Sequence, residues 1–182
     1  HWNFVERVDM KSLEKILSGG DLRSIGKSNS LVQTIRTQAD FDELFTLLFR
    51  SNRVVVMRAA DSIEKVTNNN TTYLQPHRLE ILQLCSTATD KELVWHLAQL
   101  VPRVNWNIHE LKVIWQRLSD WALDTHASRI VRVNSLQGLA DLLPQNPFMV
   151  SEFNRLIEKL NKENIPSLRA RIQKLKSRTK GR

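Results

Sequence analysis

The chain has 182 residues, of which 41% are apolar and 25% charged, a composition typical of a packed globular protein and not of a disordered or collagen-like one. A single cysteine, Cys85, excludes an intramolecular disulfide framework and any cysteine-built zinc site, and it predicts a reducing, cytoplasmic setting. The net charge of +8 is concentrated at one end, since residues 151–182 carry 10 basic and 3 acidic side chains and the rest of the chain is nearly neutral.

The first segments of the chain are expected to be peripheral. Residue 1 is His and not Met, so we expect residues 1–9 to be a non-native or fragment end. Apolar residues then appear at helical spacing between Leu13 and Leu17, and again between Leu31 and Ile35. Residues 10–39 are therefore predicted to form a degenerate N-terminal capping hairpin of two helices.

Helical periodicity dominates the rest of the sequence. Apolar side chains recur every three or four residues in the segments 56–66, 79–85, 108–122, 136–143 and 156–160. Polar clusters and prolines separate these segments, and Asp90 is expected to cap the helix that follows it. No apolar run approaches the roughly 18 residues of a membrane span. The sequence therefore predicts an all-α chain with no membrane partner.

Alternate helices of the chain match one another in sequence. Aligning segments 53–67, 91–104, 129–143 and 165–179 places Ile63 over Val101, Leu136 and Ile172, at steps of 38, 35 and 36 residues. A partner helix is predicted before each of the last three segments. Repeated two-helix units bury their apolar faces against their neighbours, so we expect a right-handed α–α superhelix, an α-solenoid, of about four to five hairpins.

Residues 53–66 resemble the second helix of a HEAT repeat in their small residues, their apolar spacing and their basic position, Arg58. Such repeats tend to carry an aspartate six residues before the basic position, as Asp90 stands before His96. The third copy departs from this pattern, with Val131 at the basic position. The resemblance implies a structural role for Arg58, which would bond loop oxygens between hairpins.

The HEAT-like resemblance covers residues 40–178 and ends before a basic tail. The repeats span 40–67, 74–104, 108–143 and 148–178, and the tail spans 179–182. Because such repeats mostly serve as binding scaffolds, the resemblance implies a non-enzymatic protein-binding module.

Second-helix positions that the core does not use are predicted to line a concave binding face. They mix both charge signs with amides, which suits a protein or peptide partner better than a phosphate backbone. The predicted protein-binding residues are Asp61, Lys65, Gln99, Arg103, Arg132, Asn134, Gln137 and Lys174.

The sequence contains no arrangement typical of metal or nucleotide chemistry. Its five histidines show no pair at metal-ligand spacing, and no GxxxxGK phosphate loop is present, so we predict no metal, no cofactor and no catalytic residue.

The enzyme alternative is a resemblance to alkylpurine DNA glycosylases, HEAT-like proteins in which an aromatic cleft, an aspartate and basic residues act together on DNA. The residues that would form such a set are Trp115, Asp120, Trp121, Arg129 and Arg132.

The tryptophans and the basic C-terminal helix each allow a simpler interpretation. Trp115 and Trp121 fit the core of one helix, whereas Trp106 is expected in a loop, either exposed or plugging the end of a hairpin. A terminal repeat needs a polar outer face, and cations stabilise a helix C-terminus. The alternative is contact with nucleic acid, an anionic membrane or an acidic protein. The residues assigned to that contact are Arg169, Arg171, Lys176 and Arg178.

Overall fold

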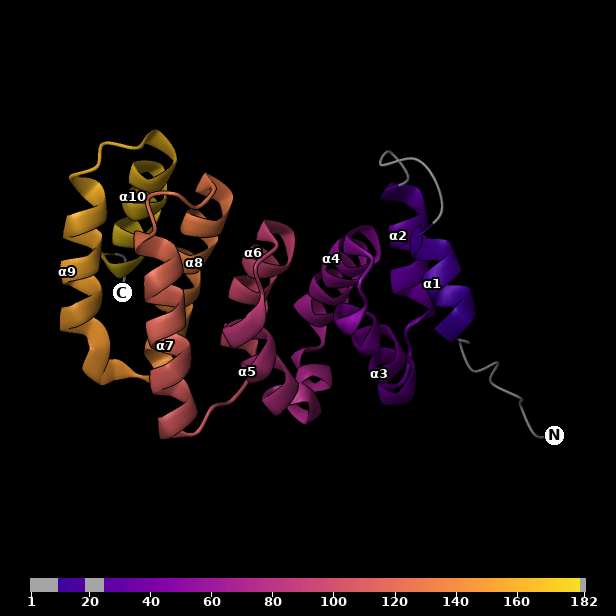
Figure 1. Cartoon of the computed structure of the whole chain (residues 1–182). Coiled ribbons are helices and arrows are strands. Elements are labelled where there is room, and N and C mark those ends of the chain that lie inside the picture. Colours follow the sequence, from indigo (N-terminus) through magenta and orange to yellow (C-terminus); the bar gives the residue numbers. More distant parts are fainter. Residues whose placement is uncertain (1–9, 19–24, 181–182) are drawn as a thin grey trace. The chain divides into compact units, whose positions relative to one another are not determined.

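The computed structural model describes residues 10–18 and 25–180, which form helices and no strand (Figure 1). The all-α prediction is confirmed for this part of the chain. None of the helices described there is long and apolar enough to cross a membrane. The predicted fragment end, residues 1–9, and the last two residues of the predicted basic tail, 181–182, lie outside these ranges.

The chain divides into two compact units, His1–Tyr73 and Leu74–Arg182. The boundary falls inside a short 3₁₀ segment, η2 (Thr71–His77). The helices described in the first unit are α1 (Met10–Ser18), α2 (Ile25–Thr34), α3 (Gln38–Thr46), η1 (Leu47–Phe49) and α4 (Arg53–Asn69).

The long helix α4 organises the first unit, because α1, α2 and α3 all pack against it. Phe41 and Phe45 of α3 are fully buried in this core, and Phe41 stacks on Tyr73 with ring centroids 5.2 Å apart. A capping box starts α3: the Thr37 hydroxyl accepts from the Asp40 N–H, and the Asp40 carboxylate accepts from the Thr37 N–H, both at 3.1 Å. Two N–H groups that the helix leaves without partners are thereby satisfied.

The second unit is a two-layer arrangement of helices. The helix α8 lies between α6 and α10 and contacts both, while α7 packs on α8 and contacts α5 (Figure 1). Trp115 of α7 meets Phe153 of α9 edge-on, with ring centroids 6.4 Å apart. The helices of this unit are α5 (Arg78–Thr87), α6 (Lys91–Leu100), η3 (Val101–Arg103), α7 (Ile108–Leu123), α8 (Arg129–Leu142), η4 (Leu143–Gln145), η5 (Pro147–Met149), α9 (Val150–Asn161) and α10 (Pro166–Lys180).

Glutamine side chains join the loops of successive hairpins in the second unit. Gln75 accepts from the Asn105 N–H at 2.9 Å and donates to the Asn105 carbonyl at 3.0 Å. Gln145 accepts from the Trp106 N–H at 3.2 Å and donates to the Val104 carbonyl at 2.8 Å. These contacts satisfy backbone groups that lie outside regular helix and fix each hairpin against the next.

Two arginines bind carbonyl groups at the C-terminal ends of other helices. Arg58 donates from Nη1 to the Leu17 carbonyl at 2.6 Å, and Arg132 donates from Nε to the Ala122 carbonyl at 2.9 Å. Carbonyls in the last turn of a helix lack intrahelical partners and carry partial negative charge. Arg58 and Arg132 therefore both have structural roles, although Arg58 binds a helix 41 residues away in the sequence and Arg132 binds the end of the preceding helix, 10 residues away.

The start of α7 is tied to α5 by one carboxylate. Asn107 and Glu110 form a capping box, in which the Asn107 side chain accepts from the Glu110 N–H at 2.9 Å and Glu110 accepts from the Asn107 N–H at 3.2 Å. Glu110 also forms an ion pair with Arg78 of α5. Asp90 occupies the N-cap of α6 as predicted, but its side chain makes no capping hydrogen bond there, so that part of the prediction is wrong.

The pair between Arg78 and Glu110 should make the stability of the second unit depend on pH. Desolvation works against ionisation, but hydrogen bonds from Arg78 and Asn107 and the charge of Arg78 hold the pKa of Glu110 below its ordinary 4.5. A depressed folded-state pKa gives stability that is present above pH 4.5 and lost as the pH falls through the folded value.

Glu110→Gln should therefore lower the urea midpoint at neutral pH, and this deficit should vanish in acid. Glu152→Gln, in the first turn of α9, is the control. A deficit independent of pH would contradict the prediction.

Candidate functional site

A polar pocket of about 460 Å³ lies on the layer formed by α6, α8 and α10. Its polar residues come from all three helices and from η3, so the site exists because these segments pack side by side. All belong to the second unit. The polar lining residues are Gln99, Arg103, Asn134, Gln137, Asp141 and Arg171; we call this site the α6–α8–α10 pocket.

The apolar part of the α6–α8–α10 pocket is set by a close approach of two helices. Gly138 of α8 lies against Ala98 of α6, and both line the pocket. A Cβ atom at position 138 would meet the Ala98 carbonyl oxygen at 2.7 Å and Leu118 Cδ1 at 3.4 Å. A glycine is therefore required for this helix separation, and the separation determines how near Gln99 and Asn134 stand to one another.

A chain of hydrogen bonds orients three of the polar side chains in the pocket. Arg171 donates from Nη1 to Gln137 Oε1 at 2.9 Å, and Gln137 donates from Nε2 to Asp141 Oδ1 at 2.9 Å. Because α10 supplies the arginine and α8 supplies the amide and the carboxylate, this chain also holds the two helices in register. One donor of Arg171 is fixed in this way, and the planar guanidinium has five N–H groups in all.

The Asp141 carboxylate is partly removed from water. Burial raises its pKa above the ordinary 3.8. The hydrogen bond from Gln137 acts in the opposite direction, as do the charges of three nearby arginines, Arg178, Arg171 and Arg103. Burial outweighs these contributions, so charges placed in this pocket interact through a medium less screening than bulk water.

One acceptor in the pocket lacks a hydrogen-bond donor. The Oε1 atom of Gln99 is buried and makes no hydrogen bond to any residue that the structure describes. A buried carbonyl oxygen without a donor is costly, and because this atom is buried it does not face the open part of the pocket. Asn134, by contrast, donates to the Ile130 carbonyl of its own helix at 2.9 Å.

The structure brings together half of the residues predicted for the concave face. Gln99, Arg103, Asn134 and Gln137 all line the α6–α8–α10 pocket. Lys174 is exposed on α10 and is not among the lining residues.

Three other predicted face residues are placed differently. Arg132 is 2% exposed, because its Nε binds the Ala122 carbonyl and its Nη2 binds the Glu163 carboxylate at 2.8 Å, so it belongs to the interior and not to a binding surface. Asp61 and Lys65 lie on α4 of the first unit and pair with each other at 2.7 Å.

The residues assigned to anion contact also separate into two groups. Arg171 is half-buried and lines the pocket, whereas Arg169, Lys176 and Arg178 are exposed on α10. Asp141 was missed by sequence reasoning. Its signal was present, since it follows the predicted Gln137 by four residues and therefore lies on the same helix face.

The set that the DNA-glycosylase resemblance would need is not assembled into one site. Trp115 is buried at 2% exposure, and Trp121 at 9% lies under the Arg117 guanidinium, 5.3 Å from its ring centroid, so both have core positions. Asp120 is exposed, lines a different hollow from Trp121, and accepts a hydrogen bond from Gln116 at 2.8 Å.

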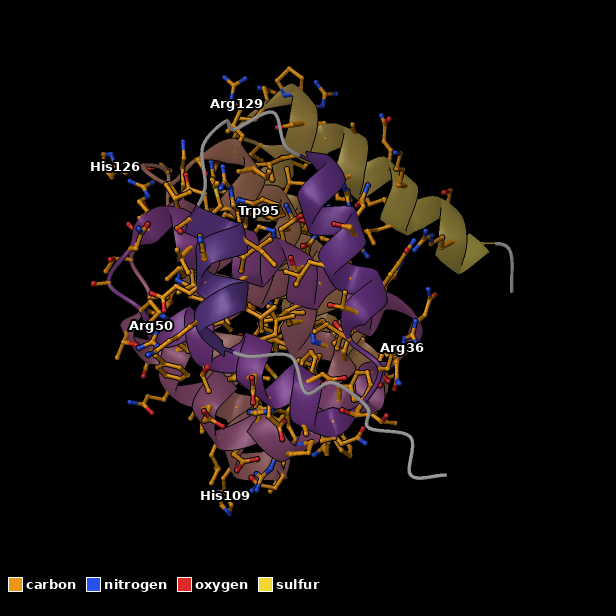
Figure 2. The ribbon with its side chains drawn as sticks, turned by 90° about the vertical axis from the view of Figure 1, so that its right-hand side faces the viewer. Arg36, Arg50, Trp95, His109, His126 and Arg129 are labelled. Carbon is orange, nitrogen blue, oxygen red and sulfur yellow. The ribbon has the colours of Figure 1, made fainter. Side chains whose placement is uncertain are left out.

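The remaining aromatic and basic candidates lie at the surface or at a hairpin end. Arg129 is exposed at the start of α8 and points away from the ribbon, as does His126 (Figure 2). Trp106 is half-buried and donates from its indole nitrogen to the Val101 carbonyl at 2.9 Å, so it plugs the hairpin end.

No group of three or more His, Cys, Asp or Glu side chains suited to a metal ion occurs among the described residues. The one cysteine, Cys85, is buried, and burial raises the pKa of its thiol to about 12 despite the nearby charge of Arg117.

No protein-family model matches the chain, and no match was found among curated proteins or solved structures. Function is therefore inferred from the geometry of the α6–α8–α10 pocket.

Proposed function

We propose that this protein is a non-enzymatic protein-binding module that holds an extended peptide segment in the α6–α8–α10 pocket. The observation that carries this proposal is the lining itself, which combines amide side chains, two arginines and a carboxylate from α6, α8, α10 and the short segment η3. An extended peptide offers alternating N–H donors and C=O acceptors, and side-chain amides can satisfy both.

The proposal extends to the architecture of the chain. We propose that the helical hairpins form a short HEAT-like solenoid. The regular spacing of contacts supports this: Gln75 binds Asn105, 30 residues away, Arg132 binds Glu163, 31 away, and Arg171 binds Gln137, 34 away. Neighbouring repeats of similar length contact one another through equivalent positions. A single, buried Cys85 supports a reducing cytoplasmic setting.

The test is selection of peptides from a phage-displayed library of random dodecapeptides on the full chain, followed by fluorescence anisotropy with the selected peptides. Asn134→Ala should weaken their binding by roughly tenfold, because one or two hydrogen bonds in the pocket are lost. Asn154→Ala is the matched control, since Asn154 is exposed on α9 and does not line the pocket. Failure to select any peptide, or equal effects of the two variants, would refute the proposal.

The second candidate is nucleic-acid binding, which one observation favours. The outer surface of α10 exposes Arg169, Lys174, Lys176 and Arg178 without an acidic residue between them. Duplex DNA bound through phosphate contacts would lose affinity steeply with salt. Tight binding of duplex DNA at near-physiological salt, lost when Lys174, Lys176 and Arg178 are changed together to glutamine, would establish this candidate instead.

A further inference from the structure

A groove of about 450 Å³ lies between α5 and α7, in the helix layer that does not form the α6–α8–α10 pocket. Its accessible wall is mostly apolar and includes Leu82 of α5 and Val113 of α7; we call it the α5–α7 groove. Independently of the proposed function, we propose that this groove binds an amphipathic α-helix of a partner protein. That helix presents aliphatic side chains to the groove and carries an acidic and a basic residue roughly eight positions apart.

Contacts at both ends of α5 hold the two walls of the groove together. Near the start of α5, Arg78 forms an ion pair with Glu110 of α7. Near its end, the Cys85 carbonyl accepts from Arg117 Nε at 2.7 Å. The partners of both contacts are 32 residues apart in the sequence, so α5 and α7 lie side by side and parallel. About two turns of each helix separate the two contacts, and the groove between them is formed before any partner binds.

The groove leaves apolar side chains open to water. Val113 is 55% exposed although it lies in the interior of a 16-residue helix. Leu82 is half-buried in the opposite wall, and Leu79, one turn earlier on α5, is 62% exposed. Exposed apolar side chains on adjoining helices are typical of interaction sites, because covering them removes apolar surface from water.

The polar groups of the lining favour a helix over an extended peptide. Arg117 donates to the carbonyls of Cys85 and Ser86, and Gln116 donates to the Asp120 carboxylate at 2.8 Å. An extended peptide brings backbone N–H and C=O groups that would need partners in the groove. A helix satisfies most of these groups internally, so it needs little more than apolar contact with the wall.

Two side chains of opposite charge specify the ends of the bound helix. Lys112 and Asp120 are the first and last lining residues of α7, about 12 Å apart along the helix. Both are exposed, and Lys112 forms no ion pair with any residue that the structure describes. Asp120 accepts from Gln116 and keeps further lone pairs. A helix with one acidic and one basic residue at this separation meets both, whereas a helix of one charge sign is repelled at one end.

The experiment uses the full chain and a phage-displayed library of helical peptides of about 18 residues, with an alanine-rich framework and one randomised face. Fluorescence anisotropy then gives the affinity of each selected peptide. Val113→Asp should weaken binding at least tenfold, because it places a charge in the apolar wall. Ile130→Asp is the matched control, since Ile130 is 45% exposed on α8 and does not line the groove. Urea unfolding of each variant establishes that it is folded.

Lys112→Glu tests the assignment of the charges. It makes both ends of the groove acidic, so replacing the acidic residue of a selected peptide with lysine should strengthen binding to this variant by about threefold. The same replacement should weaken binding to wild type by a similar factor. Lys159→Glu, at an exposed position on α9, changes the net charge equally and should keep the wild-type preference. A gain of affinity cannot come from a variant that fails to fold.

Defined results would overturn the proposal. It is refuted if no peptide is selected, if Val113→Asp and Ile130→Asp have equal effects, or if the Lys112→Glu preference matches that of wild type. A proline in the middle of a selected peptide should abolish binding, and equal binding of that version would show an extended ligand instead. Sedimentation of the chain alone tests one other occupant, since a dimer that Val113→Asp dissociates would assign the groove to a second copy of this chain.

Discussion

Arg132→Ala is expected to destabilise the second unit by about 3 kcal/mol, the largest effect that we predict for a single side chain. Arg132 is 2% exposed and donates both to the Ala122 carbonyl at the end of α7 and to the Glu163 carboxylate. Its removal leaves the helix-end carbonyl without a donor and Glu163 without a countercharge, and it opens a cavity. The cost falls at the lower end for a buried pair because the Glu163 side chain is 24% exposed.

Urea unfolding followed by tryptophan fluorescence is the measurement for Arg132→Ala. Trp95, Trp106, Trp115 and Trp121 all belong to the second unit, so their emission reports on it. Arg129→Ala, at an exposed position on the same helix, should change stability by no more than about 0.5 kcal/mol.

Glu163→Gln separates the two contributions of Arg132. It keeps an oxygen that can accept from Arg132 but leaves the buried guanidinium without a countercharge, so we expect a loss of about 2 kcal/mol, smaller than that of Arg132→Ala because the hydrogen bond to Ala122 remains. Equal losses for Arg132→Ala and Arg129→Ala would show that the buried contacts contribute nothing.

Gly138→Ala should destabilise the second unit by about 2 kcal/mol, although alanine is the better helix former. The added Cβ would lie 2.7 Å from the Ala98 carbonyl oxygen, a backbone atom that cannot turn aside, so α6 and α8 must separate. Overpacking of this kind costs about 1–3 kcal/mol, and higher helix propensity returns about 1 kcal/mol at most. Because Gly138 and Ala98 both line the α6–α8–α10 pocket, selected peptides should bind the variant more weakly.

The control for Gly138→Ala lies one turn earlier on the same helix. Asn134→Ala raises helix propensity without adding an atom toward α6, so its urea midpoint should equal or exceed that of wild type. If Gly138→Ala were also as stable as wild type, α6 and α8 would not be held at the described separation.

The helices themselves were largely predictable, because each depends on nearby residues. Apolar spacing predicted α7 at residues 108–122 and the structure has Ile108–Leu123. Aligned repeats likewise predicted helices at the positions of α4, α6, α8 and α10. The helix α3 was not predicted as a separate element; its capping box, Thr37 with Asp40, was the available local signal.

Side-chain roles at the same positions were less predictable. Arg132 and Asn134 were both predicted to lie on the binding face. Arg132 is instead buried and donates to Ala122 and Glu163, whereas Asn134 lines the pocket. Side chains two residues apart on a helix, such as these, point in directions that differ by about 200°. A repeat alignment that is uncertain by one residue cannot decide which of them faces the partner and which faces the interior.

The sequence by itself determined that this chain is helical and approximately where most of its helices lie, because periodicity, capping residues and proline act within a few residues of one another. It also determined the basic character of the last helix. The tertiary structure alone decided that Gln99, Gln137 and Arg171 share one pocket, that Asp141 stands among arginines, and that Gly138 must lack a side chain. These properties depend on distances between helices that are far apart in the sequence, which no local pattern encodes.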